Sequence, residues 1–130
     1  MTVNIHDLPG SIEYTVEFDA VAASTASMTK GWHAPYTCRV KSVKLLFGAN
    51  VTGQNSNTFH INLIDNDKST ELANKDFIAG TNATQGTEIT LYSTDKNLAS
   101  GENLYIQRQL VGAAGLATPP LTVIFAVEGR

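Results

Sequence analysis

The chain has 130 residues, with 9 basic and 12 acidic side chains and a formal net charge of −3 at pH 7. This length suits a single domain and argues against two cores of ordinary size. The hydrophobic share of 42% excludes a disordered tail. No apolar run reaches the ~20 residues that cross a bilayer, and the acidic balance argues against a nucleic-acid partner. The single cysteine excludes an internal disulfide and any C-x-x-C motif.

The composition favours a β protein with a surface rich in hydroxyl and amide groups. Charged side chains make up 16% of the chain, against about 25% in typical domains. Thr, Ser, Asn and Gln take their place, and Thr alone occurs 15 times. Thr favours strands, whereas Asn, Ser and Gly favour turns. Extracellular and viral structural β-proteins often have this character.

The first half of the chain predicts two strands and a loop. Ser11 to Asp19 alternates between apolar and polar side chains, which predicts a half-buried strand. Ala20 to Lys30 is rich in Ala, Ser and Thr and predicts a loop or an irregular edge. Tyr36 to Phe47 predicts the longest strand, in which the apolar positions change phase half-way. A bulge near Lys41–Ser42 would return these positions to one face of the sheet.

The second half continues as short strands separated by polar turns. The predicted strands are Phe59–Ile64, Glu71–Phe77, Gly86–Tyr92, Asn103–Leu110 and Leu121–Val127. The predicted turns include Gly48–Asn57, Asp65–Thr70, Ile78–Gln85 and Ser93–Gly101. No segment has a convincing helical pattern. Seven or eight strands in this spacing predict an all-β fold. We expect an antiparallel two-sheet β-sandwich of jelly-roll type, with an immunoglobulin-like sandwich as the alternative that the pattern leaves open.

The strand pattern assigns residues 11–130 to one sandwich domain and residues 1–10 to a short N-terminal arm. The arm has neither the basic region nor the apolar region of a signal peptide, so we expect none. Val3, Ile5 and Leu8 stand on a polar background, as they would if a partner covered them. A frayed terminus is the alternative.

The chain carries no motif of a known catalytic centre. G-x-S-x-G, a phosphate-binding loop and H-E-x-x-H are all missing. His6, His33 and His60 do not have the close spacing of a zinc motif. Cys38 falls in phase with the core face, where a lone cysteine behaves as a small hydrophobe. We predict no enzymatic activity, no cofactor and no metal; a cupin-like metal enzyme, which needs clustered histidines, is the alternative.

One acidic run has part of the pattern of a calcium loop. Oxygen-bearing side chains stand at five positions of an EF-hand register, namely Asp65, Asp67, Ser69, Glu71 and Asp76. The glycine that this loop requires is replaced by Thr70, and the flanks are predicted strands rather than helices. The run therefore favours a polar hairpin turn.

Two features are candidates for binding. Arg39, Lys41 and Lys44 form a basic cluster on the outward face of the Tyr36–Phe47 strand, whereas residues 1–29 carry four acids and no base. These two strands could pair within one chain or between copies, but we favour solvated surface charge. Trp32 offers an aromatic face on which a sugar could stack, but the sequence favours packing at the mouth of the sandwich.

Five segments in chain order carry a family resemblance: Gly31–Pro35, Arg39–Val43, Gly48–Phe59, Ala99–Ile106 and Pro119–Val123. In this order, over roughly Ser11 to Val127, the chain resembles the small jelly-roll cement, or decoration, proteins of tailed-phage capsids. The resemblance implies a non-enzymatic virion protein on the outer surface of the capsid. Its partners would be the major capsid protein and itself, as a homotrimer, with no nucleic acid and no membrane. Attachment would stabilise the head lattice.

On this interpretation, the predicted contact residues lie in the arm and on the basic strand: Val3, Ile5, Leu8, Arg39, Lys41 and Lys44. The alternative function is a trimeric fibre head or a carbohydrate-binding module that recognises a host receptor. Trp32, Tyr92 and Tyr105, together with the amide-rich loops, motivate this alternative.

Overall fold

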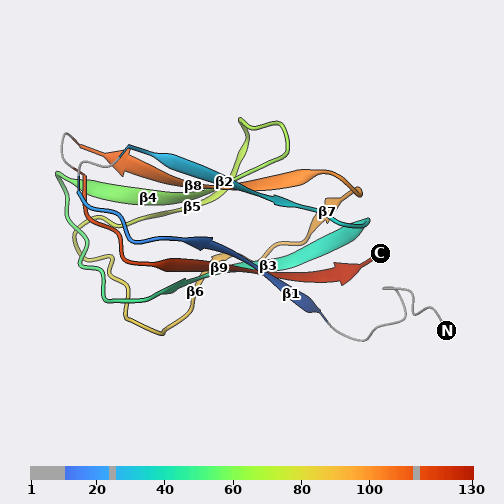
Figure 1. Ribbon diagram of the computed structural model, residues 1–130, viewed down its shortest axis with the longest axis horizontal. Coiled ribbons are helices and arrows are strands. Elements are labelled where there is room, and N and C mark those ends of the chain that lie inside the picture. Colours follow the sequence, from blue (N-terminus) through green and yellow to red (C-terminus); the bar gives the residue numbers. More distant parts are fainter. Residues whose placement is uncertain (1–10, 24–25, 113–114) are drawn as a thin grey trace.

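The computed structural model describes residues 11–23, 26–112 and 115–130, which form two sheets packed face to face (Figure 1). These residues make nine strands and no helix. The strands are β1 (Ile12–Phe18), β2 (Met28–His33), β3 (Cys38–Phe47), β4 (Thr58–Ile64), β5 (Glu71–Asp76), β6 (Ile89–Tyr92), β7 (Lys96–Leu98), β8 (Asn103–Val111) and β9 (Leu121–Gly129). The predicted all-β class is confirmed.

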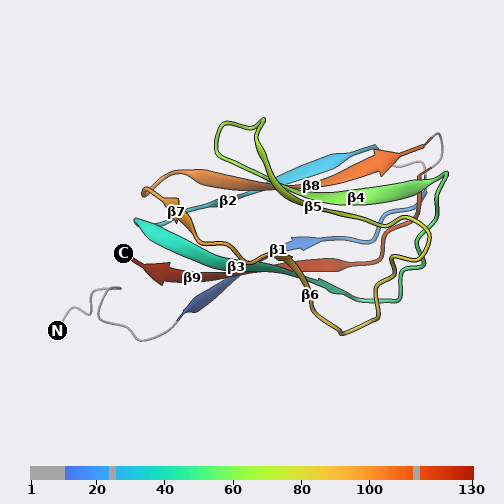
Figure 2. The ribbon, with the colours of Figure 1, turned by 180° about the vertical axis from the view of Figure 1, so that it is seen from behind.

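The chain crosses repeatedly between the two layers, which Figure 2 shows from behind. The first sheet has the order β1-β9-β3-β6, and β7 also pairs with β3. The second sheet has the order β2-β8-β4-β5. Every pairing is antiparallel. The predicted antiparallel β-sandwich is therefore confirmed.

The bulge predicted in the longest strand is present in β3. Val40 lies opposite Val127 and Ser42 opposite Ala126, so Lys41 has no residue opposite it on β9. The extra residue reverses the alternation, and the apolar side chains on both sides of it point inward. The buried side chains of β3 are Cys38, Val40, Val43, Leu45 and Phe47. One strand thus contributes to the core along its whole length.

Aromatic side chains from both sheets meet in the core. Phe59 stacks on Phe77 with ring centroids 4.7 Å apart, and Phe47 meets Phe77 edge-on at 5.4 Å. In a second group, Trp32 stacks on Phe125 at 5.1 Å. Stacked and edge-on pairs add to the hydrophobic gain of burying each ring. These contacts tie the first sheet to the second.

Two strands were not predicted, because each buries very little. Residues 28–30 fall in the predicted loop but begin β2, which lies at the edge of the second sheet. In β2, which is described throughout, Trp32 alone is buried. β7 falls in the predicted turn Ser93–Gly101, and its three residues bury Leu98. A periodic pattern is undetectable in strands with a single buried side chain.

The free edge of β1 is partly covered by β2. The Nζ of Lys30 donates a hydrogen bond to the main-chain carbonyl of Glu17 at 2.6 Å and lies 5.1 Å from the centre of the Phe18 ring. A charged side chain on an exposed strand edge hinders unwanted pairing with another chain. Lys30 therefore protects this edge as well as joining the two sheets.

Candidate functional site

The predicted basic cluster lies on the outer face of the first sheet, where each cation has an acidic partner. The closest N···O distances are 3.4, 2.9 and 3.3 Å, for Arg39–Glu128, Lys41–Asp95 and Lys44–Glu88 respectively. All three basic side chains are more than a third exposed, so each pair contributes about 0–1 kcal/mol. The cluster is charge-compensated, and it does not present an open basic patch.

The acids of the first strand are not the partners of these bases within one chain. β9 lies between β1 and β3. Glu13 faces Ala126 and Glu17 faces Thr122, and both carboxylates are exposed. The alternative that the acidic and basic strands pair within one chain is therefore wrong, because a third strand separates them. Pairing between copies stays a prediction.

Trp32 packs in the core. Its side chain is 6% exposed, Phe125 covers one ring face, and the Tyr14 ring lies 5.5 Å away. A sugar needs an open ring face on which to stack. Trp32 thus occupies the packed position that the sequence favours, and the buried indole has no open face for a sugar. The predicted arm residues Val3, Ile5 and Leu8 lie outside the described residues.

The remaining candidates for chemistry lie apart. His33 Nδ1 lies 2.9 Å from Asn103 Oδ1, and His60 Nδ1 lies 3.1 Å from Asp76 Oδ1. Cys38 is buried, and burial raises the pKa of its thiol above the ordinary value. In the part of the chain that the structure describes, no three His, Cys, Asp or Glu side chains gather as a metal site.

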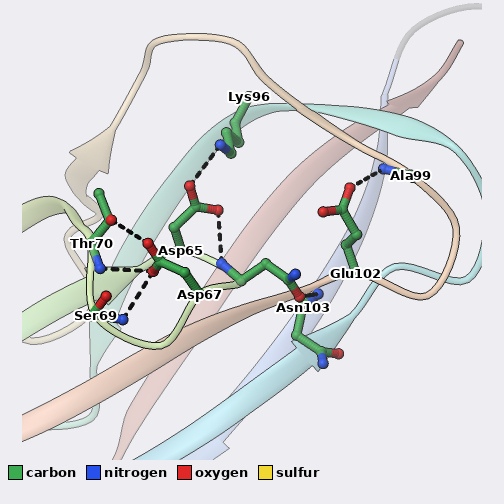
Figure 3. Close-up of polar contacts among 9 residues, drawn as sticks. Asp65, Asp67, Ser69, Thr70, Lys96, Ala99, Glu102 and Asn103 are labelled. Atoms are coloured by element: carbon green, nitrogen blue, oxygen red, sulfur yellow. Dashed lines mark hydrogen bonds and ion pairs between the residues drawn. The ribbon is translucent and has the colours of Figure 1, made fainter.

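The acidic run forms the polar hairpin turn that the sequence favours. Asp67 accepts hydrogen bonds from the amides of Ser69 and Thr70, at 2.9 and 2.8 Å, and from the Thr70 hydroxyl (Figure 3). Asp65 accepts one from the Nζ of Lys96 at 2.9 Å, and the side chain of Asn66 accepts one from the amide of Asn103 at 2.8 Å. These side chains hold the turn in shape and fasten it to β7 and β8.

The Asp67 carboxylate makes this turn sensitive to acid. The Thr70 hydroxyl and the two amides stabilise the charged form and lower its pKa from 3.8 to about 2. Because this pKa is lowered, the ionised carboxylate stabilises the turn at every pH above its ordinary pKa of 3.8. This stabilisation is lost as the pH falls from about 4 towards 2. We expect the Ser69 and Thr70 amide resonances to titrate with a midpoint near 2 in NMR spectra, and to lose that titration in Asp67→Asn. A midpoint near 4 would contradict the hydrogen-bonded arrangement.

A hollow opens on the outer face of the second sheet, beside this turn. Its volume is about 350 Å³, and its lining comes from β2, β4, β8 and the turn: Thr29, Ile64, Lys68, Tyr105 and Gln107. The turn stands out beyond the second sheet in both ribbon views. Tyr105 alternates with the buried Leu104 and Ile106, so its side chain points outward. Such hollows fall at the small end of the range for ligand sites, about 300–1,000 Å³.

A set of amides lies next to the hollow on the same face. The Asn62 amide donates to the side-chain carbonyls of Gln107 and Gln109, at 3.1 and 2.9 Å. Asn62 is buried beneath them. Because the Gln107 carbonyl is occupied in this way, its own N–H donors are oriented away from Asn62. Of the residues of the hollow and the neighbouring amides, Tyr105 alone is a binding candidate from the sequence. Gln107 could also be found, because the alternation in Asn103–Leu110 places it on the same face of the strand as Tyr105.

Comparisons with known proteins name no family. A scan against protein-family models found no match, and a search of curated proteins found no matching sequence. Within residues 11–23, 26–112 and 115–130, no helix has the length and apolar character needed to cross a bilayer. The chemistry and geometry of the two outer sheet faces are therefore the basis for assigning a function.

Proposed function

We propose that this protein is a virion structural protein. It binds the outside of a phage capsid as a homotrimeric cement, or decoration, protein and stabilises the head lattice. The observation that carries the proposal is the nested pairing of strands: β1 with β9, β2 with β8, β3 with β6 and β4 with β5. A long antiparallel hairpin that wraps into a sandwich produces this nesting, which supports the jelly-roll type. Jelly rolls are frequent among viral capsid domains.

The outer face of the first sheet suits contact with another protein. Leu46, Ile124 and Ala126 point outward there and are half-buried within the single chain. The compensated pairs of Arg39 and Lys44 lie beside them on β3. An apolar centre with a polar rim is the usual anatomy of a protein interface. We therefore assign the capsid or trimer contact to this β3–β9 face and to the predicted arm.

Attachment would stabilise the shell through mass action. A protein that binds the assembled lattice and not the free subunits shifts the equilibrium towards the assembled state. A trimer that holds several capsid subunits at once gains avidity, because its second and third contacts form at high effective concentration. No catalytic group is needed for this function.

We expect Ile124→Gln to weaken binding to heads that lack this protein by at least about tenfold, as loss of an apolar anchor at an interface centre does. Asn74→Gln, on the exposed face of the second sheet, is the matched control and should bind as the unaltered protein does. Removal of residues 1–9 should also weaken binding and leave the melting temperature unchanged. Co-sedimentation with purified heads measures the binding of all three variants, and thermal unfolding measures the melting temperature of the truncated one.

Two results would overturn this proposal: a monomeric protein that does not sediment with heads, or absence of the chain from purified particles. Absolute copy number by quantitative mass spectrometry separates the proposal from its alternative. Hundreds of copies per particle support a lattice-wide cement protein. A handful would instead support a fibre head. If Ile124→Gln bound heads as tightly as Asn74→Gln does, the β3–β9 face would not be part of the contact.

The second candidate function is a carbohydrate-binding module or fibre head. The hollow beside Tyr105 favours it, because this hollow joins an outward aromatic ring to amide and hydroxyl groups. Jelly rolls also occur among lectin domains. The two functions use opposite faces of the sandwich, so one protein can have both.

A further inference from the structure

The hollow on the second sheet offers a stacking surface for a sugar ring. The Tyr105 ring lies over Gly31 on the neighbouring strand, where a Cβ would come within 3.2 Å of its Cε1 atom. Asn103 Nδ2 donates to the Tyr105 hydroxyl at 3.3 Å and helps fix the ring. Ile64 lines the hollow from β4. An aromatic ring and a branched aliphatic side chain together accommodate the C–H face of a pyranose.

The polar lining of the hollow matches the hydroxyl groups of such a ring. Gln107 lies between Thr29 on β2 and Asn62 on β4. Because Asn62 occupies its carbonyl, the amide N–H donors of Gln107 are available to a ligand oxygen. The Thr29 hydroxyl is exposed and can donate or accept. Few but oriented polar groups on an apolar lining are typical of sites for small molecules.

The charge of the hollow selects the kind of sugar. Lys68 places its Nζ over the Tyr105 ring, 5.9 Å from the ring centre, and none of the described residues that line the hollow is acidic. Among the described residues Lys68 forms no ion pair, since the neighbouring Asp65 binds Lys96 and Asp67 binds the turn. An ammonium group without a counter-charge favours an anionic ligand.

We propose that this hollow binds a pyranose that carries a carboxylate, such as a uronic or a sialic acid, as part of a surface polysaccharide. The flexible Lys68 side chain moves off the Tyr105 ring and pairs with the carboxylate. The sugar ring then stacks on Tyr105 and Ile64, and its hydroxyls contact Gln107 and Thr29. This inference rests on the second candidate function and names its ligand class; it does not depend on the capsid function, because it concerns the opposite face of the sandwich.

The test is an NMR titration of the ¹⁵N-labelled protein with glucuronic acid, N-acetylneuraminic acid, glucose and inorganic phosphate. We expect the acidic sugars to shift the amide signals of Lys68, Tyr105 and Gln107 at about millimolar concentrations, as befits one small ligand. They should bind about two- to fivefold more tightly than glucose, which is the size of one exposed ion pair. High salt should reduce this preference.

Matched variants assign the roles of the side chains. Lys68 has a φ of 66°, a left-handed conformation that Asn tolerates, so Lys68→Asn removes the charge without straining the turn. This variant should lose the preference for acidic sugars. Lys75→Gln removes a lysine on β5 of the same sheet, which also forms no ion pair among the described residues, and should keep the preference. Tyr105→Leu should weaken every sugar by about tenfold or more, in line with the loss of an aromatic contact.

Three results would overturn the proposal: no shifts with any sugar, equal binding of glucose and glucuronic acid, or shifts produced equally by phosphate alone. An equal loss of the preference in Lys75→Gln would also overturn it, because the effect would then be one of net charge. Binding of Lys68→Asn to capsids is a separate readout. Failure of the sugar titration with intact capsid binding would leave the proposed virion function untouched.

Discussion

Trp32→Ala is expected to lower the free energy of unfolding by about 3–5 kcal/mol, the usual cost of truncating a large buried aromatic side chain. The indole is 6% exposed and stacks on Phe125, with Tyr14 on another side. Its removal would leave a cavity between the two sheets, at the one buried position of the edge strand β2. Urea unfolding followed by circular dichroism measures the loss.

Trp32→Phe is the matched control, because a smaller ring can keep the stack on Phe125 and should cost less than half as much. The pair of variants also separates packing from sugar binding. At temperatures where Trp32→Ala is still folded, its Tyr105 signals should respond to glucuronic acid as before. Trp32→Ala could instead lower the free energy of unfolding by less than about 1 kcal/mol. That result would mean either that the site collapses around the smaller side chain or that the indole is not buried.

Gly53→Ala is expected to cost about 3 kcal/mol, at the upper end of the range for overpacking. A Cβ at this position would lie 1.9 Å from the carbonyl oxygen of Ile78 and 2.3 Å from that of Thr81. Two main-chain hydrogen bonds between Val51 and Ala83, both 2.9 Å, hold the loops together, and Gly53 itself donates to the side chain of Asn82 at 2.9 Å. The backbone atoms on both sides therefore cannot move apart without loss of these bonds.

Gly48→Ala is the matched control for this prediction. Its Cβ would meet Pro120 no closer than 3.4 Å, an ordinary van der Waals contact, so we expect a change below about 1 kcal/mol. Thermal unfolding of both variants beside the unaltered protein gives the comparison. If Gly53→Ala melted together with Gly48→Ala, the two loops would have to lie further apart than the structure places them.

The elements that bury one complete face could be predicted from the sequence. The alternation in Ser11–Asp19 predicted β1, and the change of phase at Lys41–Ser42 predicted the bulge in β3. Both signals arise because side chains alternate between the faces of a sheet, so that a buried face leaves a period of two. β2 and β7 could not be found in this way, because Trp32 and Leu98 are their single buried side chains.

The candidate sites were less predictable, because they depend on which strands are neighbours. The partners of the basic strand are Glu88, Asp95 and Glu128, which lie 44 to 89 residues further along the chain from the bases they bind. The hollow likewise joins residues of β2, β4 and β8. Local patterns give the face on which a side chain lies, whereas the order and register of the strands decide what lies beside it.

The position of Cys38 has a practical consequence. The chain has one cysteine, its side chain is fully buried in β3, and burial disfavours the reactive thiolate. A thiol reagent can therefore reach this sulfur only when the structure opens around it. The rate of labelling under native conditions reports the frequency and free energy of that opening. The protein thus contains its own single-site probe of conformational fluctuation, which can be read by mass spectrometry.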